Sequence, residues 1–155
     1  MSKRLFLTAS TAAFLLLALC LPHVSVAHEG ATGVVKERME AMKEMERRMK
    51  TMAEMLKGSQ KLEFRHIETS ARQIAGHAQK IQRLFPVGSD KHPSTALPSV
   101  WAKNKQFAQS ANELTGKAMK LSTKARTKKR IVVLPAFSEV AKACKACHDN
   151  FRKRP

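Results

Sequence analysis

The sequence predicts an all-α protein, built as an antiparallel up-down four-helix bundle. Four long segments repeat their apolar residues with helical spacing. No segment alternates apolar and polar residues in the manner of a half-buried strand. The links between the segments are mostly short, which makes neighbouring helices antiparallel.

The first 27 residues have the features of a secretory signal peptide. A positive start precedes an apolar run from Leu5 to Leu21, and Ser25-Val26-Ala27 offers small residues for cleavage after Ala27. A retained membrane anchor is the alternative, but the apolar run is short for a span of roughly 20 residues. We therefore expect an exported chain that lacks Cys20 and whose residues 28–155 form one bundle domain.

The first predicted helix covers residues 33–57. Its apolar residues form two interleaved rows, each recurring every seventh position, which predicts one face turned toward the bundle core. The rows are Val35, Met42, Met49 and Leu56, and Arg38, Met45 and Met52. Gly58 and Ser59 end the helix, because glycine readily adopts the left-handed conformation of a helix C-cap.

The second predicted helix covers residues 62–84 and the third covers residues 99–122. Both carry the same seven-residue recurrence of apolar side chains. The rows are Phe64, Ala71, Ala78 and Ile67, Ile74, Ile81 in the second helix, and Val100, Phe107, Leu114 and Leu121 in the third. Between the two helices, Pro86, Gly88 and Pro93 predict a loop over residues 85–98, the longest connection in the domain.

The fourth predicted helix covers residues 131–152 and follows a basic connector over residues 124–130. Pro135 lies in its opening turns, where proline is tolerated. We expect a single inward face on this helix. That face is formed by Leu134, Phe137, Ala141, Cys144, His148 and Phe151.

The sequence Cys144-Lys-Ala-Cys147-His148 carries the most specific chemical signal. Covalent attachment of a c-type heme needs two thiols, which add to the vinyl groups of the porphyrin, and an imidazole beneath the iron. On a helix, Cys144 and Cys147 are three residues apart and His148 lies one turn after Cys144, so all three side chains can address one porphyrin. We therefore expect one covalent heme c per chain, with His148 as the proximal iron ligand.

Other uses of these residues are less well supported. A redox-active Cys-x-x-Cys pair would belong to a thioredoxin-like βαβ unit, which this chain lacks. A structural zinc site would need a second ligand pair of matching spacing, and the other histidines of the mature chain are scattered. The six methionines of the first helix suit Cu(I), but four of them lie on its apolar rows, where methionine commonly fills a core.

The up-down topology places the end of the fourth helix beside the first turns of the first helix. At the level of His148, the first helix carries Arg38 and Met42. Met42 is the leading candidate for the sixth iron ligand through its thioether sulfur, and a purely structural role in the core is the equal alternative. Arg38 would be costly to bury without a partner, and a heme propionate would satisfy its charge.

The same topology places Phe85 and Trp101 at the heme end. These side chains can wall the porphyrin or serve as ordinary bundle packing. His77 is chemically suited to be a distal ligand, but it falls about two turns from the end of the second helix, which argues against that role.

With these residues in place, the chain resembles the class II c-type cytochromes, which comprise cytochrome c′ and its low-spin, six-coordinate relatives. The resemblance covers about Thr32 to Lys153. It rests on the heme motif near the C-terminus with its continuation to Phe151 and Arg152, and on Arg38 and Met42 four residues apart. It rests further on the segments Leu84-Phe85-Pro86-x-Gly88-Ser89 and Leu97-Pro98-x-x-Trp101. The resemblance places Arg152 near the proximal face of the heme.

The resemblance implies that the residue at the distal position decides what the protein does. A non-ligating residue leaves five-coordinate iron that binds NO or CO, whereas a methionine that ligates iron gives an electron carrier. Because Met42 holds this position, we expect a periplasmic one-electron Fe(II)/Fe(III) carrier with His148 and Met42 as axial ligands. Binding of NO or CO is the alternative. No acid–base pair or substrate pocket is evident in the sequence, so we do not expect an enzyme.

The formal net charge is +17, or +15 without Lys3 and Arg4 of the signal, and it favours acidic partners. We expect an acidic redox protein to dock at the heme end, near Arg152 to Arg154, and a weak contact of the basic connector with an anionic membrane surface stays open. Nucleic acid is not expected, because the chain is exported and shows no Gly-rich phosphate loop or zinc-finger spacing. A homodimer through the first two helices is a further option that the resemblance implies.

Overall fold

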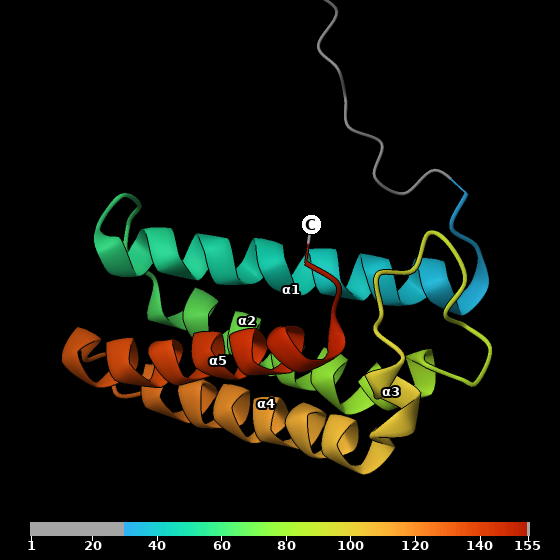
Figure 1. The fold of residues 1–155 in the computed structure, drawn as a ribbon. Coiled ribbons are helices and arrows are strands. Elements are labelled where there is room, and N and C mark those ends of the chain that lie inside the picture. Colours follow the sequence, from blue (N-terminus) through green and yellow to red (C-terminus); the bar gives the residue numbers. More distant parts are fainter. Residues whose placement is uncertain (1–29, 155) are drawn as a thin grey trace, which may run out of the picture.

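The computed structural model describes residues 30–154, so the predicted signal peptide lies outside the described residues. Within them the chain forms α1 (Gly33–Lys57), α2 (Phe64–Lys80), the short 3-10 helix η1 (Ile81–Leu84), α3 (Ser99–Ala102), α4 (Asn104–Ala125) and α5 (Arg130–Phe151). The predicted four-helix bundle is confirmed (Figure 1). None of the helices within residues 30–154 is both long enough and apolar enough to cross a membrane.

Two of the four predicted helices are interrupted. The second ends as η1, because Phe85 precedes Pro86 and the residue before a proline is disfavoured in the helical region; Phe85 takes φ −127° and ψ 55°. The third is broken at Lys103, which has φ −116° and ψ 43° and donates its backbone N–H to Ser99 at 2.8 Å. The short α3 is therefore a continuation of the 85–98 loop and not the first turn of α4.

The first helix has the predicted bounds because of its C-cap. Gly58 adopts φ 88°, a left-handed conformation that costs glycine little. Its N–H closes the last turn of α1 by donating to the carbonyl oxygen of Met55 at 3.2 Å. The chain then reverses into α2 through a short turn, as an antiparallel hairpin requires.

The helices do not pack equally against one another. The contact between α2 and α4 is the most extensive, followed by that between α4 and α5, while α1 packs mainly on α2 and touches α5 only sparsely. The residues that directly follow α5 turn toward α1 (Figure 1). The bundle is therefore tightest around α4 and loosest between α1 and α5.

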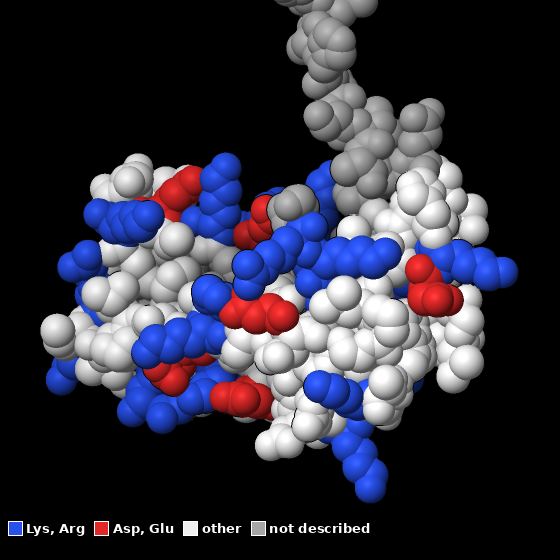
Figure 2. Space-filling model, in the orientation of Figure 1, with Lys and Arg blue, Asp and Glu red and all other residues white. Residues whose placement is uncertain are grey.

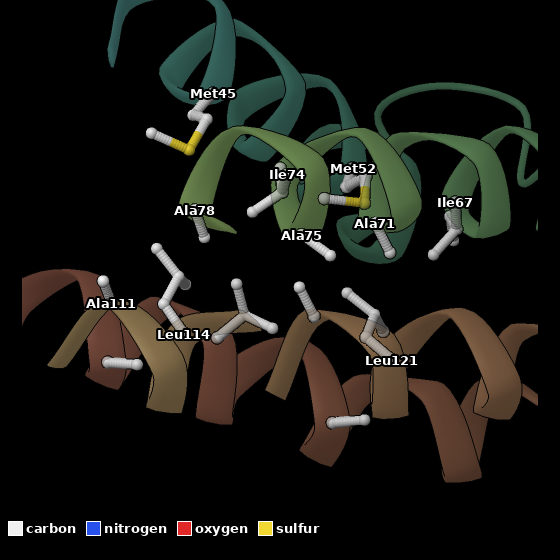
Figure 3. Close-up of a cluster of buried hydrophobic side chains, with 14 of the residues drawn as sticks. Met45, Met52, Ile67, Ala71, Ile74, Ala75, Ala78, Ala111, Leu114 and Leu121 are labelled. Carbon is white, nitrogen blue, oxygen red and sulfur yellow. The ribbon is translucent and has the colours of Figure 1, made fainter. Parts of the chain in front are cut away.

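The core lies between α2 and α4, with α1 closing it from one side. Side chains of α2 and α4 point toward each other, and methionines of α1 reach down onto α2 (Figure 3). The labelled members are Met45, Met52, Ile67, Ala71, Ile74, Ala75, Ala78, Ala111, Leu114 and Leu121, all of them buried. The rows predicted for α2 and α4 thus form the core, with only Phe64 half-buried.

The two rows predicted on α1 differ in burial. The row of Arg38, Met45 and Met52 is buried. In the other row Leu56 is buried, whereas Val35, Met42 and Met49 are half-buried, although Met42 and Met49 do pack against the core. The apolar surface of α1 is therefore wider than the area that α2 covers.

The predicted inward face of α5 is wrong by about one residue. The buried row consists of Val133, Ala136, Val140, Ala143 and Phe151. Leu134 and Ala141, which were expected inside, are exposed, while Phe137, Cys144 and His148 are half-buried. A shift of one residue rotates a helix face by about 100°, so α5 buries one row on the bundle and leaves the Cys144 row beside it only partly covered.

Candidate functional site

Cys144, Cys147 and His148 lie on one side of the last turns of α5. At about 100° per residue, these three positions span an arc of roughly 100°. All three are half-buried, and both cysteines are free thiols without a disulfide. The helix therefore presents two thiols and one imidazole together, at the edge of its packed face.

Burial sets the protonation of these groups. Desolvation raises the pKa of the Cys144 thiol, and it raises that of Cys147 to about 11, with the neighbouring Cys144 adding to the shift. The pKa of His148 is lowered, first by burial and then by the positive charge of Arg152. At neutral pH the thiols are thus protonated and the imidazole is neutral, and neutral imidazole is the form that ligates a metal.

These residues fit a covalent heme better than a metal site made of protein ligands alone. Within residues 30–154, no group of three or more His, Cys, Asp or Glu side chains is arranged to hold a metal ion by itself. The half-buried Cys144 row of α5 and the half-buried Met42 row of α1 instead leave two partly covered apolar strips, on two helices that contact each other only sparsely. Two thiols, an imidazole and flanking apolar strips are a donor set that suits a porphyrin.

Arg38 is the most strongly bonded charged side chain of this region. It is only 4% exposed, and burial lowers its pKa while the charge of Asp90 opposes that shift. Its guanidinium donates to Leu84 O at 3.2 Å, Ser89 Oγ at 2.9 Å, Ser89 O at 2.5 Å and Ser94 Oγ at 2.6 Å. It also lies 4.4 Å from the centroid of the Phe85 ring.

The partners of Arg38 within residues 30–154 are all neutral oxygens. The loop after η1 satisfies the buried charge with neutral oxygens, so the geometry does not require a heme propionate to do so. Contact between Arg38 and the cofactor stays a prediction. What Arg38 does in this structure is fasten α1 to the 85–98 loop.

The same loop is also fastened to the end of α5. Leu97 N donates to Phe151 O at 2.9 Å, and Lys153 N donates to Thr95 O at 2.8 Å. Ser99 Oγ adds a bond to Asn150 O at 2.7 Å. The 85–98 loop thus joins the turn of α1 that precedes Met42 to the turn of α5 that follows His148.

Aromatic side chains pack where the 85–98 loop connects α1 to α5. The Phe85 ring meets the Phe107 ring at 4.9 Å, and Phe107 meets Phe151 at 5.2 Å, both edge to face. Trp101 lies 6.4 Å from Phe85, and its Nε1 donates to the carbonyl oxygens of Phe85 and Pro86. Phe85 and Trp101 therefore lie together as the topology predicted, while their contact with a porphyrin stays a prediction.

Arg152 contacts the 85–98 loop through its backbone, whereas His77 lies apart from that loop. Arg152 is exposed, its backbone bridges to Ala96, and its charge acts on His148. His77 lies on α2 near Glu44 and Arg48 of α1, and burial lowers its pKa. Its neighbours are thus charged groups on the α1–α2 side rather than the Cys144 row.

Two loop serines that were not predicted from the sequence accept hydrogen bonds from Arg38. Ser89 and Ser94 are buried in the loop, and Ser89 Oγ also donates to Pro86 O at 2.8 Å. A buried arginine on an apolar row already demanded acceptors. Nothing local indicated that two loop serines, 51 and 56 residues away, would supply them.

Known proteins of one family are similar to this chain in sequence and in fold. The family model described as Cytochrome C′ matches residues 33–152. A cytochrome c′ of Rhodopseudomonas palustris is 33% identical over 126 residues, which are 79% of this chain and 84% of that protein. A solved structure of cytochrome c′ from Rhodopseudomonas palustris superposes with a TM-score of 0.74 at 29% identity, and the match covers 80% of this chain and 98% of that one.

Two further solved structures bear on ligands and assembly. One is a nitric oxide complex of a variant cytochrome c′ from Alcaligenes xylosoxidans, with a TM-score of 0.71 and 26% identity over 78% of this chain and 94% of that one. The other is a cytochrome c′ described by its ligand-controlled dimer dissociation, with a TM-score of 0.72 and 25% identity over 78% of this chain and 95% of that one.

Proposed function

Because the chain belongs to the cytochrome c′ family and carries heme c covalently, we propose that it binds NO or CO at an open distal face of the heme iron. We assign covalent attachment to Cys144 and Cys147 and proximal ligation to His148. When bound, the heme supplies an Fe(II)/Fe(III) centre that can take a diatomic ligand. The comparisons favour this reading over the His148/Met42 electron carrier that the sequence alone suggested.

One observation carries the proposal most directly: Met42 packs against the buried core of the bundle. A methionine engaged in core packing fills space as an apolar side chain does. Packing of this kind supports a distal face that the Met42 side chain lines without ligating the iron. A variant cytochrome c′ from Alcaligenes xylosoxidans, a relative of the same fold, forms a nitric oxide complex, which supports gas binding in this chain.

In this proposal, three parts of the chain position the heme and control access to its iron. His148 offers a neutral imidazole on the proximal side, where burial and Arg152 lower its pKa. Arg38 and the 85–98 loop hold α1 and α5 at a set separation, because the loop is bonded to both helices. The half-buried apolar row of α1 keeps charge away from the distal face and limits the entry of water.

A second candidate function is electron transfer with Met42 bound to iron. It is supported by the exposure of Met42, which is half-buried rather than sealed in the core like Met45 and Met52. The methionine side chain is unbranched and can change rotamer readily. If this candidate holds, an acidic redox partner docks near Arg152 to Arg154 and exchange rates fall steeply with salt.

Spectra of the purified ferric protein and of Met42→Leu separate the two candidates. The gas-binding proposal expects high-spin EPR signals in both proteins and ready formation of NO and CO adducts. Low-spin signals with the far-red absorption of Met–Fe ligation, lost in Met42→Leu, would support electron transfer instead. Leucine keeps the apolar volume, so the substitution tests the sulfur and not the packing.

Localisation and assembly are part of the same proposal. We propose that residues 1–27 are removed on export to the periplasm, so that the mature chain begins at His28, which N-terminal sequencing checks. We also propose a homodimer, supported by the relative known for ligand-controlled dimer dissociation. Sedimentation with and without CO tests both the dimer and its response to ligand.

A further inference from the structure

The end of the bundle opposite Cys144 and His148 is strongly basic. It comprises residues 54–68, around the α1–α2 turn, and residues 124–131, around the α4–α5 turn; we call it the basic end. These residues include eight lysines and arginines against three glutamates. Lys and Arg side chains outnumber acidic ones at the left of Figure 2, where both turns lie in Figure 1.

The basic end is a fixed surface, because hydrogen bonds tie its two turns together. Arg130 donates to Leu56 O from Nε at 3.0 Å and from Nη2 at 2.5 Å, which binds the start of α5 to the end of α1. Arg126 forms an ion pair with Glu68 at 3.2 Å, which binds the connector to α2. The charges are therefore presented together on a rigid base.

Apolar side chains project among these charges. Ile131 is 79% exposed and Leu134 is 42% exposed, two of the four exposed large hydrophobic residues within residues 30–154. They are three residues apart and so share one face of α5. Next to them, a hollow of about 410 Å³ runs between α4 and α5. It is lined by Lys117, Lys120, Lys124, Val132, Pro135, Ala136 and Glu139.

We propose that the basic end attaches the protein to a bilayer surface that contains anionic phospholipid. Lysines and arginines meet the lipid phosphates, and Ile131 and Leu134 enter the boundary between headgroups and acyl chains. Basic residues combined with a few protruding apolar ones are what binding to an anionic bilayer surface uses. Lys120 and Lys124 extend the contact along the apolar floor of the hollow.

A protein partner suits this surface less well. A stable protein interface needs an apolar centre within roughly 800 Å² of buried surface on each side, and here only two aliphatic side chains project. A redox partner is also disfavoured at the basic end, because the end of the bundle that holds His148 is far away. His148 is 18 residues beyond Arg130 and so about 27 Å farther along α5. An attached bilayer would leave the Cys144–His148 end facing away from the membrane.

The test is co-sedimentation of the mature holoprotein with vesicles of phosphatidylcholine, with and without phosphatidylglycerol. The proposal expects binding only to the vesicles with phosphatidylglycerol, and loss of binding as salt shortens the Debye length. Lys128→Glu/Lys129→Glu should lower the partition coefficient about tenfold or more. Lys103→Glu/Lys105→Glu is the matched control, since it changes the net charge equally at two exposed positions, one between α3 and α4 and one in the first turn of α4.

Hydrogen exchange locates the contact. Bound vesicles should slow amide exchange in residues 57–63 and 124–134 and leave the 85–98 loop unchanged, and Ile131→Ser should weaken binding without altering the far-UV spectrum. Equal losses in the two double variants would overturn the proposal, because binding would then follow net charge alone. Absence of binding at low salt, or capture of an acidic protein by the same residues without any vesicle binding, would overturn it as well.

Discussion

Replacing Arg38 by alanine removes the one side chain within residues 30–154 that bonds α1 to Ser89 and Ser94. Four charge-assisted hydrogen bonds are lost, and the carbonyl oxygens of Leu84 and Ser89 lose a donor. Breaking a buried charged network of this kind costs about 3–5 kcal/mol. The free energy of unfolding should fall by about 3 kcal/mol, at the low end of that range, because the guanidinium no longer has to be desolvated and the serine hydroxyls can turn elsewhere.

For a domain of this size, a loss of about 3 kcal/mol lowers Tm by about 10 °C. Circular dichroism of the holoprotein measures the change, and hydrogen exchange should show faster opening of the 85–98 loop than of α4. Arg38→Lys should lower the free energy of unfolding by about half as much, since lysine keeps the charge but lacks the several N–H donors of a guanidinium.

Arg47→Ala is the matched control for this experiment. Arg47 lies on the same helix and is bonded to Glu44 at 2.7–2.9 Å, but it is exposed. Its removal should cost about 0.5 kcal/mol or less. If Arg38→Ala loses no more stability than Arg47→Ala, the loop is not held by Arg38 and the reasoning fails.

Three further predictions follow from the described residues. Ser122→Ala should raise stability by about 1 kcal/mol, because the buried Ser122 hydroxyl has no partner, whereas Ser110→Ala on the same helix should change little; equal effects in denaturant titrations would contradict this. Glu139 has its pKa lowered to about 2 by Lys117 and Lys142, so its ion pairs stabilise the fold above about pH 4.5 and are lost as pH falls toward 2. The Tm difference between wild type and Glu139→Gln should vanish over that window, and a difference independent of pH would refute the ion-pair account. Cys144→Ser/Cys147→Ser should abolish heme staining on denaturing gels, and a retained stain would remove the assigned attachment.

The parts of the fold that the sequence predicted are those governed by local rules. The bounds of α1 follow from Gly58, and the buried rows of α2 and α4 follow from apolar residues that recur among polar ones. The grouping of Cys144 with His148 follows from helix geometry alone. In each case a short stretch of chain contains the whole cause.

The face of α5 was mispredicted because its sequence is apolar nearly all round. From Ile131 to Phe137, only Pro135 interrupts the run of apolar residues, so a row through Leu134 and a row through Val133 are equally consistent with the spacing. Packing against α4 decides between them, and it selects the smaller residues Val133 and Ala136. The buried row of α5 is therefore determined by tertiary packing, and the spacing of apolar residues within α5 does not reveal it.

The partly covered strips on α1 and α5 and the 85–98 loop follow from one requirement. A bundle that must hold a flat group between two helices cannot let those helices pack on each other, so their separation must be set by something else. Here the loop supplies the connection, since it bonds to Arg38 on one side and to Phe151 on the other. The core between α2 and α4 then carries most of the packing, while α1 and α5 are held apart at the end where Met42 and His148 lie. On this view, substitutions in the loop should alter the distal face as strongly as substitutions on α1 itself, although neither His148 nor Met42 lies in the loop.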